Sequence, residues 1–361
     1  MPGVYISWPF CAQKCTYCNF ASGVFPRHLE ARYLERQLAE MAGHAWQWTP
    51  ETVYLGGGTP GSMDLDALQA VLGAIAGRPW REATIEAAPG AITREQAQAW
   101  RGYGINRVSL GVQSFADAEL RRTGRRHNAA AVAADVALLR DAGIHEINID
   151  LIAGLPGQTP ASWRESLAWI ERLSPPHVSV YMLEVDEDSR LGNELLQGGL
   201  RFGAPDVPAE DSIAEFYEQA VSRLADLGLR RYEISNFARP GHESVHNLKY
   251  WRLEPYAGFG AGAHGFDGTT RFRNVETPAE YVEAADPMLE ATPASPDEER
   301  FFVGLRLMSG VELQPGDELR HGPAIARFVA SGLLHREANR IRLTPRGVML
   351  SNEVFEAFLH D

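Results

Sequence analysis

Short apolar segments alternate with amphipathic helical segments along the first half of the chain, and this alternation restricts the possible folds more than any other feature. The predicted strands cover residues 3–7, 52–56, 83–87, 107–112, 146–152 and 177–183. The predicted helices between them cover residues 28–44, 64–77, 93–104, 128–143 and 160–173. Strands that alternate with helices in this way form a parallel sheet, which is either open or closed into a barrel.

Polar residues stand at the ends of these predicted strands. The third and fifth strands carry Glu86 and Asp150 near their ends, Gln113 and Glu184 follow the fourth and sixth, and the second runs into Gly-Gly-Gly-Thr-Pro at 56–60. In parallel α/β folds, ligands bind at the carboxyl ends of the strands. Any one of these residues alone could be a helix cap or a turn residue. All of them together favour one shared site.

The regular alternation fades after residue 200. A helix is predicted over 208–228, and residues 230–266 are rich in aromatic side chains, glycine and histidine. Residues 290–297, Glu-Ala-Thr-Pro-Ala-Ser-Pro-Asp, have the composition of a linker. We therefore expect a first domain over 1–289, with its core over about 1–185.

A second domain is expected over 290–361. Its sequence predicts two helices, a hairpin around Ala338 and Asn339, and a last helix from Pro345, an outline that resembles a winged helix. From residue 298 onward there are eight Arg against nine Asp and Glu, so DNA binding is not expected. A packing or partner domain fits this charge balance better.

The charge of the whole chain argues against a nucleic-acid partner. It has 34 Lys and Arg against 47 Asp and Glu, a formal net charge of -13, and no basic run long enough to form a binding face. No apolar run reaches the length of a transmembrane helix. The start of the sequence lacks the basic and apolar regions of a signal peptide. We expect a cytoplasmic protein without a transmembrane span, which leaves open peripheral contact with a membrane.

The chain has three cysteines, Cys11, Cys15 and Cys18, and all lie in one short segment. A transient disulfide with one spare thiol is one alternative. A zinc site is another, but it needs a fourth ligand, and the nearest histidine, His28, lies at an unusual spacing. Thiolates are the normal ligands of iron–sulfur clusters. Three thiolates on a four-iron cluster leave one iron open to another ligand, and clustered free thiols fit a reducing cytoplasm.

The cysteine segment resembles that of the radical S-adenosylmethionine (SAM) superfamily. The resemblance rests on the C-x3-C-x2-C spacing, on Tyr17 just before the third cysteine, and on the glycine-rich segment 56–60 behind the next strand. It implies a [4Fe-4S] cluster held by Cys11, Cys15 and Cys18. It also implies that SAM chelates the open iron and that an electron from the cluster cleaves it to a 5′-deoxyadenosyl radical.

Nearly the whole chain is similar to the oxygen-independent coproporphyrinogen III oxidases and their relatives. The resemblance implies an incomplete parallel (β/α)6 barrel with an appended C-terminal domain. At the position of Glu184 the oxidases have a small residue whose backbone contacts SAM. The resemblance therefore implies a SAM contact from the main chain of Glu184 only. The resemblance implies that SAM is bound by the residues that match the family's SAM-binding positions. These are Tyr5, Gly57, Gly58, Thr59, Glu86, Gln113, Arg125, Asp150 and Glu184.

Three features separate the chain from the oxidases. The oxidases carry a fourth cysteine two residues after the third, where this chain has Phe20. They also carry an extension ahead of the barrel, whereas the first predicted strand here begins within a few residues of Met1. Third, His-Asn-Leu-Lys-Tyr-Trp at 246–251 resembles a motif of the heme-chaperone branch of the group.

The motif at 246–251 suits heme binding. His246 would supply an axial imidazole, and the neighbouring aromatic rings offer a flat apolar surface to a macrocycle. His242 is a weaker alternative ligand, and His264 is expected to line the SAM site through its backbone. From the residues alone, the motif could instead hold a loop over the mouth of the barrel.

Two functions follow from these resemblances. The first is a heme chaperone that binds heme and a SAM-ligated [4Fe-4S] cluster and delivers heme to respiratory or heme-storage acceptor proteins. The second is an oxygen-independent coproporphyrinogen III oxidase, which uses a SAM radical to decarboxylate two propionates of its substrate. Phe20 and the motif that begins at His246 favour the chaperone. The sequence leaves open whether SAM is cleaved or only bound.

Overall fold

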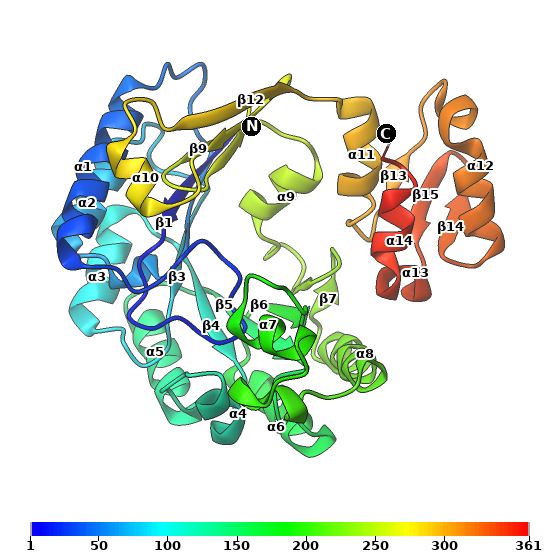
Figure 1. Ribbon diagram of the computed structural model, residues 1–361, viewed down its shortest axis with the longest axis horizontal. Helices are drawn as coiled ribbons and strands as arrows, with labels where there is room; N and C mark the ends of the chain where they lie inside the picture. Colours follow the sequence, from blue (N-terminus) through cyan, green and yellow to red (C-terminus); the bar gives the residue numbers. More distant parts are fainter. Residues whose placement is uncertain (1, 360–361) are drawn as a thin grey trace.

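The computed structural model describes residues 2–359, and its centre is a row of six parallel strands with helices packed on the outer face (Figure 1). The strands are β1 (Gly3–Trp8), β2 (Thr52–Gly57), β3 (Glu82–Ala87), β4 (Arg107–Gln113), β5 (Glu146–Ala153) and β6 (His177–Met182). The connecting helices are α1 (Arg27–Gly43), α2 (Leu65–Gly73), α3 (Arg94–Tyr103), α4 (Asp117–Arg122), α5 (Ala129–Asp141) and α6 (Pro160–Leu173), with the short turn η1 (Pro60–Ser62). The strand and helix predictions for this half of the chain are confirmed.

The strands alternate between an apolar outer face and a polar inner face. Val108 and Leu110 of β4 are fully buried under the helices. Arg107 and Ser109, which alternate with them, line an interior cavity. Successive side chains of a strand point to opposite faces. Burial of the outer set, at about 25 cal/mol per Å² of apolar surface, holds the helices on the sheet and leaves the inner face free for polar residues.

Additional strands extend the parallel row at both edges, so the described residues form a sheet in the order β12-β11-β10-β9-β1-β2-β3-β4-β5-β6-β8-β7. β9 pairs with β1 in parallel, and β8 pairs with β6 in antiparallel fashion. The added strands are β7 (Arg230–Arg231), β8 (Asn236–Ala238), β9 (Tyr256–Phe259), β10 (His264–Phe266), β11 (Thr270–Asn274) and β12 (Met288–Pro293). Because the row ends at β12 and β7 without a pairing between them in the described part of the chain, the barrel is open on one side.

The linker prediction for residues 290–297 is wrong in its first part. Residues 288–293 form β12, which pairs with β11 in antiparallel register from Thr270 to Asn274. Every side chain of β12 is exposed. The strand is therefore held by backbone hydrogen bonds at a sheet edge, which leave no apolar alternation in the sequence to reveal it.

The region after β12 follows the predicted order of two helices, a hairpin and a final helical segment. Its elements are α11 (Pro296–Gly304), β13 (Val311–Glu312), α12 (Asp317–Ala330), β14 (Leu334–Glu337), β15 (Arg340–Leu343), α13 (Pro345–Met349) and α14 (Ser351–Glu356). β13 adds a third strand to the hairpin. The division into two domains stays a prediction, but Figure 1 shows these elements grouped on the open side of the barrel.

The remaining helices fall between β6 and this C-terminal group in the sequence. They are α7 (Arg190–Leu196), η2 (Arg201–Asp206), α8 (Glu210–Asp226), α9 (Val245–Trp251) and α10 (Pro278–Glu283), and α10 packs on α1. α9 contacts α11, and the guanidinium of Arg306 lies 4.6 Å from the ring of Trp251. None of the helices within residues 2–359 combines the length and the apolar composition that a membrane crossing requires.

Candidate functional site

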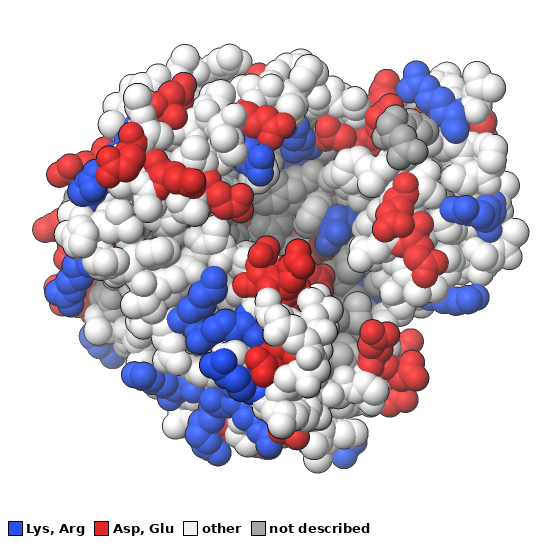
Figure 2. All heavy atoms as spheres, viewed as in Figure 1, with Lys and Arg blue, Asp and Glu red and all other residues white. Residues whose placement is uncertain are grey.

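A cavity of about 1000 Å³ lies inside the open barrel, and its mouth is the hollow at the centre of Figure 2. Its walls include the starts of strands, such as Arg107 and His177, as well as their ends, such as Gln113. On the open side of the barrel, Arg306 and residues 348–353 of the C-terminal group complete the wall. Ligand pockets usually measure roughly 300–1,000 Å³, so this cavity can hold a ligand larger than a single amino acid.

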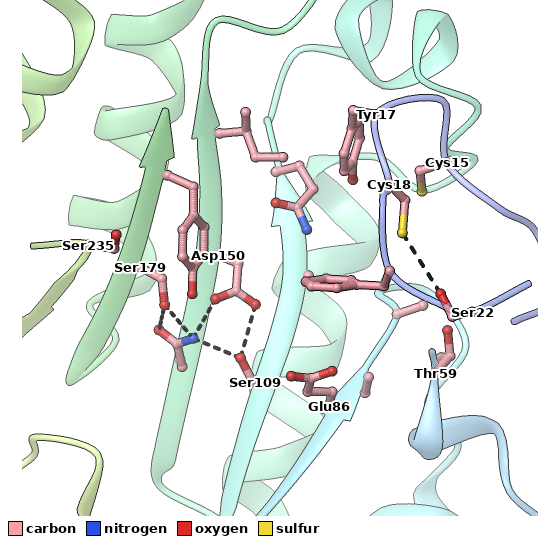
Figure 3. A pocket seen from close by; sticks show the side chains of 18 of the residues that line it. Cys15, Tyr17, Cys18, Ser22, Thr59, Glu86, Ser109, Asp150, Ser179 and Ser235 are labelled. Atoms are coloured by element: carbon pink, nitrogen blue, oxygen red, sulfur yellow. Dashed lines mark hydrogen bonds between the residues drawn. The ribbon is translucent and has the colours of Figure 1, made fainter. Parts of the chain in front are cut away.

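The interior wall of this barrel is polar. A closed (β/α)8 barrel usually fills its interior with bulky branched apolar side chains. Here the inward side chains are small or polar, and they make hydrogen bonds with one another across neighbouring strands (Figure 3). The inward polar residues are Thr84, Glu86, Arg107, Ser109, Asn148, Asp150, His177, Ser179 and Asn236. The barrel interior is therefore a cavity wall that carries many hydrogen-bonding side chains, not a packed apolar core.

The loop between β1 and α1 carries the three cysteines at one end of the cavity. Its base is closed by hydrogen bonds of 2.8 Å from Cys11 N to Gly23 O and 2.9 Å from Gly23 N to Pro9 O. Cys11, Cys15 and Cys18 all line the cavity, are partly buried and form no disulfide. The sequence prediction that these thiols belong to one site therefore agrees with their common position on the cavity wall.

The donor set of this loop fits a cluster better than a single ion. Within residues 2–359, no three His, Cys, Asp or Glu side chains converge on a point that one metal ion could occupy. In an iron–sulfur cluster each thiolate binds its own iron, so three cysteines need only face a common space. Cys11, Cys15 and Cys18 do so. Burial raises the pKa of the Cys11 thiol, and binding to iron would displace its proton.

The glycine-rich segment after β2 packs directly against the base of the cysteine loop. The backbone N–H of Gly58 donates to Trp8 O at 2.7 Å, and that of Thr59 donates to Phe10 O at 2.9 Å. A Cβ atom at Gly58 would lie 2.7 Å from Phe10 O, which is closer than real contacts allow. Gly57, with φ at 104°, also lines the cavity. This segment thus positions the cysteine loop as well as facing the predicted SAM site.

The two acids predicted to bind SAM lie on adjacent parts of the cavity wall (Figure 3). Glu86 accepts a hydrogen bond of 2.8 Å from the Tyr54 hydroxyl, and burial raises its pKa to about 7. Asp150 accepts hydrogen bonds of 3.0 Å from Ser109 Oγ and 2.7 Å from Asn148 Nδ2. Burial also raises the pKa of Asp150. Both carboxyl groups are therefore positioned to accept hydrogen bonds from ribose hydroxyls or to face a cationic group.

Gln113 and Arg125 stand between these acids and the cysteines. Gln113 has a positive φ of 70° at an irregularity of β4, and its Oε1 atom is buried without a hydrogen-bond partner. Arg125 Nη1 lies 3.1 Å from both Cys15 Sγ and the Tyr17 hydroxyl. An unpartnered polar atom on a cavity wall is a position that a ligand can satisfy. Arg125 links the cysteine loop to the end of β4.

Two predicted SAM residues lie at the margins of the cavity. Tyr5 does not line it, because its ring stacks behind Tyr54 with 6.2 Å between ring centroids. Burial raises the pKa of Tyr5. Glu184 lines the cavity two residues beyond the end of β6 and is exposed. The SAM roles of both residues stay predictions.

His246 lies at the opposite end of the strands from the cysteine loop. Its Nδ1 is 2.9 Å from Thr52 Oγ1, and its Nε2 is 2.8 Å from the Tyr250 hydroxyl. The ring is fully buried, and burial lowers its pKa to about 3. Glu82 accepts hydrogen bonds from the first N–H groups of α9. His246 therefore has no free nitrogen that faces the cavity in this conformation, although the next residue, Asn247, lines it.

His242 and His264, the other histidines considered for heme or SAM, also lie away from the cavity wall. His242 Nδ1 is 2.8 Å from Glu146 Oε1 at the start of β5. His264 lies in β10 and pairs with Arg273 of β11. Neither residue lines the cavity. The expected backbone contribution of His264 to the SAM site therefore has no support in this arrangement.

Comparisons with known proteins place these observations in a family. Residues 5–170 match the radical SAM superfamily model. The chain is 35% identical to the "Heme chaperone HemW" of Lactococcus lactis, with 99% of this chain and 97% of the relative covered. It is 30% identical to the Escherichia coli protein of that name, again with 99% and 97% covered. The chain belongs to the HemW family. It carries the radical SAM fold predicted from its sequence.

A solved structure has a similar fold over nearly the whole chain. Coproporphyrinogen III oxidase (HemN) from Escherichia coli matches with a TM-score of 0.84 at 20% sequence identity, and 99% of this chain and 90% of that one are covered. At this sequence identity the structural match shows a shared fold and nothing about a shared function. This HemW family member therefore shares the oxidase's arrangement of elements, so evidence on function has to come from the residues of the cavity.

One such residue is Phe20. Its side chain is 66% exposed and lines the cavity beside the cysteine loop. The sequence comparison placed the fourth cysteine of the oxidases at this position. An exposed aromatic ring cannot replace a thiol as a metal ligand, so this HemW family member has three cysteine ligands at most.

Several cavity residues were missed by the sequence analysis. Thr84, Arg107, Asn148, His177 and Ser179 line the deeper part of the cavity. The signal was present, because each predicted strand has polar residues two positions apart, as in Arg107-Val-Ser-Leu-Gly. A strand with one polar and one apolar face is usually half exposed to solvent. In this protein the polar face of each strand lines an interior cavity instead.

Proposed function

We propose that this HemW family member is a heme chaperone that holds a SAM-ligated [4Fe-4S] cluster and passes heme to acceptor proteins. The observation that carries the proposal is the identity of 35% to a heme chaperone over 99% of the chain. The acceptors would be respiratory or heme-storage proteins of the cytoplasm or of a membrane surface, and nucleic acid is not a partner.

The chain's own residues support the cluster and SAM as ligands of the cavity. Cys11, Cys15 and Cys18 would hold the cluster and leave one iron open. When bound and reduced, the cluster supplies one electron to the sulfonium centre of SAM. The backbone of residues 57–59 keeps the cysteine loop against the cavity, as the hydrogen bond of 2.7 Å from Gly58 N to Trp8 O illustrates.

Four polar residues would orient SAM. Asp150 and Glu86 would accept hydrogen bonds from ribose hydroxyls or from the amino group, since both line the cavity and both are anchored by neighbouring donors. Gln113 would use its unpartnered Oε1. Arg125, beside Cys15, would offer N–H donors to the carboxylate of SAM.

Heme would be the cargo of this chaperone, not a resident cofactor. An axial imidazole from His246 remains the prediction from the motif, but both nitrogens of this ring are engaged, by Thr52 and Tyr250. Ligation by His246 would therefore require α9 to move and to give up at least one of these hydrogen bonds. This helix of seven residues is also held by Glu82 at its N-terminus and by the ion pair of 2.7 Å between Lys249 and Glu51, so these contacts would have to yield as well.

The alternative function is oxygen-independent coproporphyrinogen III oxidase. The fold shared with HemN is compatible with it, whereas Phe20, 66% exposed at the position of the fourth cysteine, argues against it. One anaerobic experiment separates the two. Reconstituted protein receives SAM, dithionite and coproporphyrinogen III, and a second sample receives heme and then an apo heme-binding acceptor.

The chaperone proposal expects stoichiometric heme binding, transfer of that heme to the acceptor, and no protoporphyrinogen IX. His246→Ala should lose most of the binding, and His335→Ala, at an exposed position of β14, serves as the matched histidine control. Rapid formation of protoporphyrinogen IX would replace the chaperone with the oxidase. Heme binding that is indifferent to His246 and His242 together would remove the motif from the heme site.

A further inference from the structure

The side of the large cavity that meets the C-terminal group carries an arginine without a paired acid. Arg306 lies two residues beyond α11, lines the cavity and is partly buried. Figure 2 shows basic atoms inside the central hollow on this side. Arg271 and Arg300 form ion pairs with acids, whereas none of the ion pairs or side-chain hydrogen bonds within residues 2–359 involves Arg306.

Two aromatic rings hold the guanidinium group of Arg306 in place. Its central carbon lies 4.6 Å from the ring centroid of Trp251, at the end of α9, and 5.8 Å from that of Phe355 in α14. Its Nε atom is buried without a hydrogen-bond partner. An aromatic face attracts a cation without using any of the cation's N–H donors. Arg306 is therefore positioned by packing, and its N–H groups are left for a ligand.

Glu233 and Glu353 bear on the charge of Arg306, and neither pairs with it. Glu233 is buried and does not line the cavity. Burial raises the pKa of its carboxyl group, and the charge of Arg306 opposes part of this rise, so the two groups interact without an ion pair. Glu353 lines the cavity from α14, but it is exposed, and water and salt screen an exposed charge. The positive potential at Arg306 is therefore weakened but not cancelled.

Polar side chains without partners line the cavity on the two helices that carry these aromatic rings. Asn247 belongs to α9, Ser351 and Asn352 begin α14, and both helices contact α11. None of these three side chains takes part in a hydrogen bond of the described residues, since Asn247 uses only its backbone N–H. Deeper in the cavity, Ser109 and Ser179 bond to neighbouring side chains instead. Free amide and hydroxyl donors near a guanidinium suit an anionic acceptor such as a carboxylate.

Apolar side chains line the cavity next to these polar groups. Met349 and Leu350 directly precede Ser351, and Ile234 directly follows Glu233. Ligand pockets usually combine an apolar lining with a few polar groups that fix the orientation of the ligand. A ligand for this side of the cavity would thus have an apolar body and at least one carboxylate. Heme has this composition, because its flat macrocycle carries two propionate groups.

We propose that Arg306 anchors heme by binding one of its propionate groups, and that Asn247, Ser351 and Asn352 supply further donors. A planar guanidinium donates two parallel hydrogen bonds to a carboxylate. No covalent bond forms or breaks in this step. The inference rests on the proposed heme chaperone function and names the part of the cargo that this side of the cavity recognises.

The position of Arg306 is compatible with ligation of heme by His246. Both His246 and Trp251 belong to α9, and Trp251 packs on Arg306. A movement of α9 that frees His246 would thus take place beside the propionate site. SAM does not need Arg306, because Arg125 beside Cys15 is the donor proposed for its carboxylate.

The test compares heme with its dimethyl ester, in which both propionates are masked. Reconstituted wild type, Arg306→Gln and Arg306→Lys are titrated with each iron porphyrin in the same detergent buffer, and absorbance follows binding. Arg306→Gln should weaken heme binding roughly 10-fold or more, because a hydrogen bond to a charged group is lost, and should leave the affinity for the ester unchanged. Arg306→Lys keeps the charge but not the planar geometry, so it should lose less.

The matched control is Arg252→Gln. Arg252 directly follows α9, is exposed and does not line the cavity. This variant carries the same charge change as Arg306→Gln and should bind heme like the wild type. Equal losses in the two variants would mean that only the net charge matters and would overturn the propionate site.

The ester also detects a purely structural effect of the substitution. Arg306 packs against Trp251 and Phe355, so its replacement could loosen the contact with the C-terminal group. Loosening would weaken the binding of heme and ester equally, and that result would overturn the proposal. Ser351→Glu is an independent measurement, since it adds a carboxylate to the same wall and leaves Arg306 in place. It should weaken heme binding roughly 5-fold or more through like-charge repulsion and spare the ester.

The proposed function and the propionate site fail in different ways. A wild type that does not bind heme would end both. A wild type that binds heme through His246, but binds the ester equally well, would keep the chaperone and remove Arg306 from the heme site. SAM should change the paramagnetic spectrum of the reduced cluster in Arg306→Gln as in the wild type. Loss of that change would assign Arg306 to SAM and overturn the inference.

Discussion

The hydroxyl of Tyr54 donates a hydrogen bond of 2.8 Å to Glu86 on the wall of the cavity. The same tyrosine ring lies 5.3 Å, between ring centroids, from the imidazole of His246 at the other end of the strands. Tyr54 thus contacts both the predicted SAM site and the motif helix α9. A change in the charge of Glu86 therefore alters the hydrogen bond that it accepts from the Tyr54 hydroxyl. The ring of the same tyrosine packs on His246.

Replacement of any one cysteine should abolish the cluster. Anaerobically reconstituted wild-type protein should hold about four irons, and Cys11→Ala, Cys15→Ala or Cys18→Ala should lose the cluster absorption and the paramagnetic signal, because these are the chain's three thiols. Ser22→Ala, whose hydroxyl lies 3.8 Å from Cys18 Sγ, is the control and should keep its iron. Stoichiometric zinc in place of iron would contradict the assignment.

Asp150→Ala and Glu86→Ala should each weaken SAM binding roughly 10-fold or more, because a hydrogen bond to a charged group contributes about 1.5–3 kcal/mol. The readout is the change that SAM causes in the paramagnetic spectrum of the reduced cluster. Asp141→Ala, on the exposed end of α5, is the control and should bind SAM normally. Unchanged affinity in both cavity variants would remove the two acids from the SAM site.

Glu86 should make stability depend on pH. Burial raises its pKa from 4.5 to about 7 in the folded protein, so between these values the folded state holds a proton that the unfolded state releases. Stability therefore falls as the pH rises through this window, and the loss is complete above the folded pKa. Because water reaches the cavity and screens the charge, we expect the free energy of unfolding to fall by about 1–3 kcal/mol over this window.

Urea unfolding of the ligand-free protein at pH 4.5 and pH 8 measures this effect, since the raised pKa of Glu86, about 7, falls between the two conditions. The contribution of Glu86 is the difference between wild type and Glu86→Gln, which cannot ionise. The wild type should lose more stability than the variant on going to the higher pH. Parallel curves for the two proteins would show that the Glu86 pKa is not raised.

Gly58→Ala should destabilise the protein by about 1–3 kcal/mol and lower cluster occupancy. Its Cβ would lie 2.7 Å from Phe10 O at the base of the cysteine loop. Gly73→Ala is the control, since a Cβ there meets nothing within 4 Å and alanine favours the helix. Chemical denaturation and iron analysis check both outcomes. If Gly58→Ala changed neither the stability nor the iron content, the base of the cysteine loop would have room for the added Cβ atom.

Tyr250→Phe should strengthen heme binding if α9 must open. The substitution removes the hydrogen bond of 2.8 Å to His246 Nε2, and the loss of about 1 kcal/mol from the closed state corresponds to roughly a 5-fold gain in affinity. Heme titration followed by absorbance measures it. Tyr103→Phe, on α3, should bind heme like the wild type. Weaker binding by Tyr250→Phe would indicate that the hydroxyl itself contacts heme.

The sequence by itself determined the strands and helices of the barrel and the residues that end the strands. Polar and apolar residues alternate over 107–112, and a glycine follows residue 55 at the end of the second predicted strand. These are local signals, because each depends on a few neighbouring residues. The cysteine spacing is local in the same way. These features could therefore be predicted from the sequence, as the agreement of β1 to β6 illustrates.

Only the tertiary structure decided where distant residues meet. Arg125 contacts Cys15, which lies 110 residues away, and His246 contacts Thr52, which lies 194 residues away. The polar face of the strands is an interior wall because the barrel leaves a cavity there, and β12 forms because its backbone completes an edge. Such contacts depend on how the sheet curves and which elements cover it. The sequence of one segment carries no record of this, since burial and pairing are properties of the whole folded chain.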